Sequence, residues 1–183
     1  MSSLFSTVPR TKKGYEKDEV DDFFDEARAL YEGRENRTLT SGEIQTATFE
    51  LVRGGYSTHE VDAALDRLES AFIARQRAAY VSVHGQQAWM DALAGRARTL
   101  YDRLGRPDGK RFVPADRGEP AYDMDDVDDL CDRLVDYFDR QVPLTAAEVR
   151  DTVFRRRKGP KGYAEGPVDA FCSRAVEVLL GVE

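Results

Sequence analysis

The sequence predicts an all-α protein made of tandem repeats, in which a short helix and a turn precede a longer amphipathic helix. One motif, Gly-Tyr with Val-Asp beginning five residues after the tyrosine, occurs four times with small changes. Apolar residues after each motif recur with helical spacing, and no segment shows the alternation typical of a β-strand. We therefore expect two duplicated pairs of repeats, residues 1–80 and 111–183, separated by a helical spacer at 81–110.

The four copies share the same positions, which we expect to be structural. Tyrosines of paired copies are 41 residues apart in both halves, so copies one and two form one pair and copies three and four the other. Copy three has Ala121 where the other copies have glycine. The motif residues are Gly14, Tyr15, Val20 and Asp21; Gly55, Tyr56, Val61 and Asp62; Tyr122, Val127 and Asp128; and Gly162, Tyr163, Val168 and Asp169.

Each motif leads into a predicted helix of about four turns, because apolar residues follow the tyrosine at offsets of 5, 8, 9, 12 and 16. Ser57 with Glu60 has the pattern of a capping box at the second helix, and Asp123 can cap the third. Pro167 is compatible with a first helical turn only, which places the start of the fourth helix just before it.

Two shorter helices precede copies two and four, and the spacer holds another long one. The segments 39–49 and 144–154 both begin with Leu-Thr and a Thr-x-x-Glu capping box, at Thr40 and at Thr145. In the spacer, an apolar stripe predicts an amphipathic helix that ends at the turn sequence 105–109. That stripe consists of Trp89, Leu93, Leu100 and Leu104.

The motif residues allow more than one interpretation. Glycine before the tyrosine indicates either a positive φ or a close approach of a neighbouring segment. At Ala121, therefore, either the turn differs or φ is negative. Each tyrosine ring is expected to cover the base of its helix. The recurring aspartates lie at the edge of the apolar stripe, where they either pair with the basic loops or a partner, or remain solvated acids favoured by the helix dipole.

Composition narrows the class of protein. The 183 residues include 34 acidic and 27 basic side chains, and a net charge of −7 disfavours a dedicated nucleic-acid binder. No apolar run approaches the roughly 20 residues that span a bilayer, and the first residues do not form a signal peptide. Two cysteines in a chain without an export signal indicate a reducing cytoplasm.

No motif indicates catalysis. Cys131 and Cys172 occupy a repeat position that Phe24 and Leu65 fill elsewhere, so a small apolar side chain explains both better than metal or redox chemistry. His59 and His84 have no zinc-type or nucleophile pattern around them. There is no phosphate-binding loop. We expect no enzyme activity, no metal and no cofactor.

The segment 39–68 resembles the N-terminal domain of DivIVA, a bacterial polar and septal scaffold family. The shared pattern is Leu-Thr, an apolar residue on a short helix, phenylalanine, a basic loop, Gly-Tyr, and then an acidic residue, valine and aspartate. The positions that carry it are Leu39, Thr40, Ile44, Phe49, Arg53, Gly55, Tyr56, Glu60, Val61 and Asp62. Copy four repeats the pattern from Leu144 to Asp169, and the resemblance covers about 130 residues.

This resemblance implies a cytoplasmic, non-enzymatic adaptor or scaffold in bacterial cell division or polar envelope growth that works through protein partners. The alternative is a peripheral protein whose basic loops bind the anionic inner face of the membrane. Because the copies are covalently linked, we expect partner copies to pack within one molecule, giving a monomer or small oligomer.

The basic loops are either membrane contacts or solvated loops, and we expect any membrane contact to lie in the loop of copy four. The candidate residues are Arg155, Arg156, Arg157, Lys158 and Lys161 in copy four, Arg53 in copy two, and Arg10, Lys12 and Lys13 in copy one.

Overall fold

The computed structural model describes residues 4–34 and 37–183. The chain divides into two compact units, Met1–Gln76 and Arg77–Glu183, and helix α3 (Thr58–His84) runs from the first into the second. Each unit contains one pair of repeat copies. The residues expected to form a separate spacer belong to the second unit.

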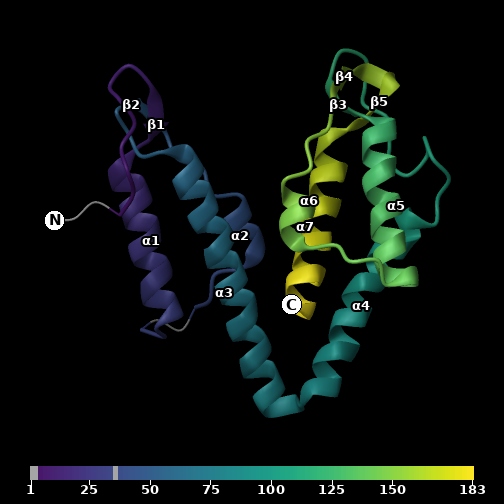
Figure 1. Ribbon diagram of the computed structural model, residues 1–183, viewed down its shortest axis with the longest axis horizontal. Coiled ribbons are helices and arrows are strands. Elements are labelled where there is room, and N and C mark those ends of the chain that lie inside the picture. Colours follow the sequence, from purple (N-terminus) through teal and green to yellow (C-terminus); the bar gives the residue numbers. More distant parts are fainter. Residues whose placement is uncertain (1–3, 35–36) are drawn as a thin grey trace. The chain divides into compact units, whose positions relative to one another are not determined.

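In the first unit, a pair of strands joins the starts of the two long helices (Figure 1). Strand β1 (Lys13–Tyr15) precedes helix α1 (Lys17–Tyr31), and strand β2 (Leu51–Arg53) precedes α3. The strands are antiparallel, with Gly14 opposite Val52. The short helix α2 (Ser41–Gln45) lies between α1 and β2 in the chain.

The second unit repeats this plan with one helix and one strand more. Strand β3 (Pro120–Asp123) is the central strand of an antiparallel sheet of order β4-β3-β5. The other elements are helix α4 (Gln86–Leu104), helix α5 (Met124–Arg140), the short helix α6 (Ala146–Arg150), strand β4 (Arg156–Lys158), the 3₁₀ turn η1 (Gly159–Lys161), strand β5 (Gly162–Ala164) and helix α7 (Glu165–Val182).

The expectation of an all-α fold is therefore wrong, because the described residues form two small antiparallel sheets as well as seven α-helices. The strands have three or four residues, which is too short to show an alternating pattern. Their partners are also distant in the sequence, since Lys13 pairs with Arg53 and Tyr122 with Arg156. Local sequence patterns carry no signal of such pairing.

The long helices bury the apolar stripe that the repeat predicts. The valines five residues after each motif tyrosine are at most 1% exposed, namely Val20, Val61, Val127 and Val168. Tyr31 departs from the pattern and is 43% exposed. Both predicted capping boxes of the short helices are present, and Asp123 caps α5. Glu60 instead accepts hydrogen bonds from the backbone N–H and the hydroxyl of Ser6.

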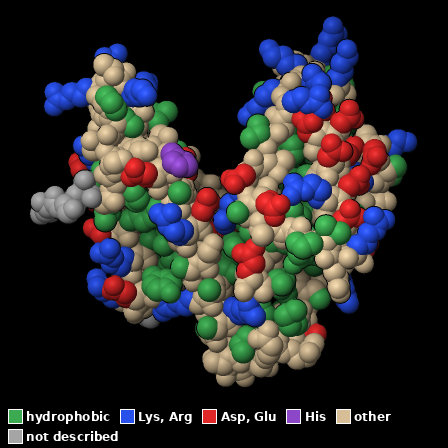
Figure 2. Space-filling view, in the orientation of Figure 1, with side chains coloured by type: hydrophobic (Ala, Val, Ile, Leu, Met, Phe, Trp, Pro, Cys, Tyr) green, Lys and Arg blue, Asp and Glu red, His purple; other side chains and the backbone are tan. Residues whose placement is uncertain are grey.

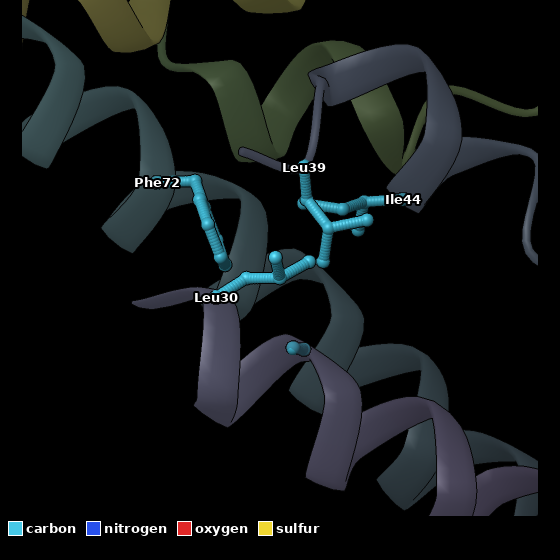
Figure 3. Close-up of a cluster of buried hydrophobic side chains, with 5 residues drawn as sticks. Leu30, Leu39, Ile44 and Phe72 are labelled. Atoms are coloured by element: carbon cyan, nitrogen blue, oxygen red, sulfur yellow. The ribbon is translucent and has the colours of Figure 1, made fainter. Parts of the chain in front are cut away.

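In the first unit, α2 closes the core between the two long helices. Leu39 and Ile44 pack against Leu30 and Phe72 (Figure 3), and Ala27 belongs to the same buried cluster. Glu69 of α3, which is 1% exposed, accepts hydrogen bonds from Ser41 and Gln45. This carboxylate therefore fixes α2 on α3.

In the second unit, α4 packs closely on α7. The indole N–H of Trp89 donates to the carbonyl oxygen of Gly181 over 3.0 Å. A Cβ at Gly181 would lie 2.6 Å from Leu93, so this glycine allows the two helices to approach. The predicted stripe of α4 is buried as expected, with Trp89, Leu93, Leu100 and Leu104 each at most 4% exposed.

The motif glycines are needed for backbone contact, not for a positive φ. Gly14, Gly55 and Gly162 are absent from the glycines with positive φ. A Cβ at Gly14 would lie 2.2 Å from the Tyr56 carbonyl oxygen, and one at Gly55 would lie 2.3 Å from that of Tyr15. Backbone atoms fill the space that a side chain would need, so the two segments can cross only at glycine.

The second unit keeps one of the two crossing glycines. A Cβ at Gly162 would lie 2.5 Å from the Tyr122 carbonyl oxygen and 2.7 Å from the Ala121 Cβ. Ala121 is fully buried and has no positive φ. Its methyl group fits because its partner in the crossing is a glycine.

We predict that Gly162→Ala destabilises the second unit by about 1–3 kcal/mol, because the added methyl group overlaps backbone atoms. The control is Gly166→Ala in the first turn of α7, where a Cβ meets nothing within 4 Å. Alanine favours helix there, so the control should be neutral or stabilising. The stability of both variants is measured by urea unfolding, followed by the fluorescence of Trp89, the one tryptophan of the chain. Equal midpoints would refute the steric explanation.

Candidate functional site

The repeated motif forms a crossing at which each copy reaches onto its partner copy. In the first unit, Tyr15 N–H donates to the Tyr56 carbonyl oxygen over 3.0 Å, and Tyr56 N–H donates to the Tyr15 carbonyl oxygen over 2.8 Å. In the second unit, Tyr122 and Tyr163 are directly opposite each other in β3 and β5. We call these four residues the crossed tyrosines.

Each crossed tyrosine packs against a phenylalanine of the partner copy. The ring centroids are between 5.1 and 5.4 Å apart in all four pairs, with edge-to-face or tilted geometry. The pairs are Phe5 with Tyr56, Phe49 with Tyr15, Phe112 with Tyr163, and Phe154 with Tyr122. The phenylalanine of each repeat and the tyrosine of its partner thus interlock the two copies.

The recurring aspartates also bind the tyrosine of the partner copy. The Tyr56 hydroxyl donates to Asp21 Oδ2 over 3.1 Å, and the Tyr163 hydroxyl donates to Asp128 Oδ1 over 3.0 Å. Tyr15 with Asp62 and Tyr122 with Asp169 form the equivalent pairs. Burial and the neighbouring carboxylate raise the pKa of Tyr122 and Tyr163 to about 12. The roles considered from the sequence, which were pairing with a basic loop or a partner, or remaining a solvated acid, did not name the motif tyrosine as the group bound.

Around Asp128 the second unit adds a buried arginine that the sequence reasoning missed. Arg111 is 5% exposed and donates from its guanidinium to the Asp128 carbonyl oxygen and the Asp132 carboxylate. Its backbone N–H donates to the Tyr163 hydroxyl, and Gly109 N–H donates to Asp128 Oδ2 over 2.7 Å. Burial raises the pKa of Asp128. The one feature of the sequence that could have indicated this role is the position of Arg111 directly before Phe112, the phenylalanine of copy three that corresponds to Phe5 in copy one.

The equivalent place in the first unit has a different arrangement. Leu4 occupies the repeat position of Arg111, and its backbone N–H reaches the Tyr56 hydroxyl. Asp21 Oδ1 is buried and has no hydrogen-bond partner among the described residues. The crossing is thus the same in both units, whereas the groups that donate hydrogen bonds to the aspartate differ.

The basic loop of copy four, Arg155–Lys158 with Lys161, is largely paired with carboxylates of its own unit. We call these five cations the second basic tip. Arg155 donates to Asp126 at 2.7–3.0 Å and to Asp123 at 3.0 Å. Arg156 pairs with Glu165, and Arg157 pairs with Asp123. The bond to Asp126 raises the pKa of Arg155, and the same bond lowers the pKa of Asp126.

The pairing of β1 with β2 brings Arg10, Lys12, Lys13 and Arg53 to one end of the first unit, and we call these cations the first basic tip. Lys13 lies directly opposite Arg53 in the two strands, and Lys12 accepts from Gly54 N–H through its carbonyl oxygen. All four side chains are exposed, and none makes an ion pair with any residue that the structure describes. Blue Lys and Arg side chains mark this end in Figure 2.

The cysteines and histidines lie away from any shared site. Cys131 is buried and Cys172 half-buried, and burial raises the pKa of each thiol to about 12. His59 is exposed in the first turn of α3, and His84 stacks on Tyr80 at the end of that helix. Across residues 4–34 and 37–183, no three His, Cys, Asp or Glu side chains gather in a way that could hold a metal ion.

The comparisons with known proteins leave the family open. No protein-family model matches the sequence, and no curated protein or solved structure shows significant similarity to it. None of the described helices combines the length and the apolar composition needed to cross a bilayer.

The buried Asp128 gives a pH test of the crossing. Its raised pKa means that the folded protein holds a proton there more tightly than the unfolded chain does. The carboxylate therefore favours folding most when it is protonated, and this contribution is lost as pH rises through the folded pKa. Asparagine cannot titrate. The stability of Asp128→Asn relative to wild type should rise as pH increases from below the ordinary aspartate pKa of 3.8 to neutral.

Urea midpoints read from Trp89 fluorescence at several pH values measure this difference. The slope of this stability difference with pH is diagnostic, because the hydrogen bonds lost in Asp128→Asn change the stability by a similar amount at every pH. The control is Asp129→Asn, which removes the same charge at an exposed position of the same helix. A falling difference for Asp128→Asn would contradict a pKa raised by burial at Asp128.

Proposed function

We propose that the chain is a non-enzymatic, cytoplasmic adaptor that resembles DivIVA and acts in bacterial cell division or polar envelope growth through protein–protein contacts. The observation that supports it is the use of the repeated polar groups. The motif tyrosines and aspartates, the polar residues that occur in every copy, pair with each other across the crossing, by hydrogen bonds of 3.0–3.1 Å at Tyr56 and Tyr163 and by proximity of the carboxylate at Tyr15 and Tyr122. They hold copies together and are not arranged around a substrate.

The internal pairing also suits an adaptor. Two copies that would otherwise need two chains are joined in one chain, and this happens twice. Each paired unit therefore forms without the concentration dependence of a dimer. A molecule with two such units can hold two partners, as a scaffold does.

A fluorescent fusion in the native cells tests this function. We expect the wild-type protein to concentrate at division sites or poles, and Gly55→Val to disperse, because its side chain would overlap the Tyr15 backbone. The control Gly42→Val lies in α2, where a Cβ has no neighbour within 4 Å. Even distribution of the wild-type protein would contradict a role in division or polar growth.

Contact with an anionic membrane is a second candidate, favoured by the first basic tip. Like charges directly opposite each other on two strands are destabilising, yet Lys13 faces Arg53 and no carboxylate of the described residues is paired to either. An anionic surface would remove this repulsion, and each cation near such a surface contributes about 1 kcal/mol.

The charge balance favours the first tip over the second. The sequence placed any membrane contact in the loop of copy four, but Arg155, Arg156 and Arg157 already bind Asp123, Asp126 and Glu165. Moving them to lipid would break those pairs. The four cations of the first tip have no such pairs to lose.

Sedimentation with anionic liposomes distinguishes the tips. We expect Lys13→Gln with Arg53→Gln to weaken binding by about thirtyfold, from two cations at about 1 kcal/mol each, without loss of stability. The control Arg28→Gln with Arg67→Gln changes the same charge on exposed helix positions of the same unit and should leave binding unchanged. Equal losses of liposome binding in the two double variants would indicate that binding depends on net charge alone. No salt-sensitive sedimentation of the wild type would leave the adaptor function without a membrane role.

A further inference from the structure

The second unit contains an open apolar groove that the crossing does not use. It has a volume of about 320 Å³ and lies among α4, α5 and α7. Leu93 and Val178 form its buried floor, and the exposed side chains of Met90, Tyr101 and Val182 form its rim. Hydrophobic side chains also gather near the C-terminal end of α7 in Figure 2.

The α4 side of the groove has the spacing of a helix-packing surface. Met90, Ala94, Ala97 and Tyr101 follow each other in steps of four, three and four residues, so they form one stripe. It lies beside the buried stripe of Trp89, which contacts α7 and whose Leu93 forms the floor of the groove. The two alanines in its middle would let another helix come close.

One charged side chain lines the groove, and it lacks a partner. Arg98 is exposed and makes no ion pair or hydrogen bond with the residues that the structure describes. Of the two tyrosines that line the groove, Tyr101 is engaged, since its hydroxyl donates to Asp139 over 3.0 Å. The groove therefore offers a partner one unpaired cation beside an apolar surface.

We propose that this groove binds an amphipathic helix of a partner protein, with large apolar side chains in the groove and a carboxylate on Arg98. The inference rests on the proposed adaptor function and names the chemistry of its partner. The volume suits one or two large side chains, and the opening to solvent suits a segment of a macromolecule. Three helices forming a groove for a fourth is a common mode of peptide recognition.

The charge of the groove argues against a second copy of this chain as the occupant. A symmetric dimer would place the same patch against itself, and so would bring the two Arg98 side chains toward each other; none of the described acidic residues lines the groove, and Asp139 at its rim already accepts from Tyr101. An acidic helix removes that repulsion and pairs the cation.

The test is selection of helical peptides from a display library against the full chain. Enriched peptides should carry large apolar residues together with Asp or Glu. Ala94→Arg should weaken their binding by about tenfold or more, because its side chain fills the groove. The control Gly95→Arg adds the same charge one residue away, where a Cβ meets nothing within 4 Å, and should have no effect. Circular dichroism and Trp89 fluorescence verify that each variant is folded.

Reversal of Arg98 tests the polar half of the proposal. Arg98→Glu should weaken the selected acidic peptides, whereas Lys110→Glu, the same charge change at an exposed residue outside the groove, should not. Binding should also shift the methyl NMR signal of Met90, one of three methionines. Failure to enrich any peptide, binding that ignores Ala94→Arg, or dimers that Ala94→Arg disrupts would each overturn the proposal. A fusion that still localises would leave the adaptor function intact.

Discussion

Two backbone segments cross within van der Waals distance in each unit, and the remaining contacts between copies depend on that crossing. The approach is so close that glycine is required at Gly14 and Gly55, since a Cβ at either would lie within 2.3 Å of a carbonyl oxygen. The reciprocal hydrogen bonds between Tyr15 and Tyr56 then set the register. Once the backbones cross, each tyrosine necessarily projects onto the helix of the other copy.

The interlock that results combines apolar and polar contacts on the same ring. One edge of each tyrosine packs on a phenylalanine and its hydroxyl binds an aspartate, both from the partner copy. A hydroxyl buried without an acceptor would cost free energy, so the aspartate recurs wherever the tyrosine does. The pairing therefore specifies which copy binds which, in addition to stabilising the unit.

The same plan leaves different surfaces in the two units. In the first, the pairing of the strands collects four cations that have no acidic partner among the described residues. In the second, Asp123 and Asp126 bind the arginines of the loop, and α4 adds the walls of an apolar groove. A duplicated pair can thus keep its interior and diverge in the surfaces that it exposes.

Much of this molecule followed from sequence alone, because helices are specified by contacts close along the chain. The period of apolar residues predicted the buried valines Val20, Val61, Val127 and Val168, the Thr-x-x-Glu patterns predicted the caps of α2 and α6, and Trp89 with Leu93 predicted the buried face of α4. The repetition of the motif also predicted that copies pair in two halves.

Only the tertiary structure decided what the motif is for. The strands are too short for a local pattern and pair residues about 40 positions apart, so the sheets were not predictable from periodicity. Whether glycine served a positive φ or a crossing depended on which backbone lay beside it. The roles of Asp128, Arg111 and Glu69 depended on burial, since a charged residue on a helix has the same local sequence whether it faces water or a partner copy. Charge neutralisation at Arg155 likewise needed Asp126, 29 residues away, to be folded against it.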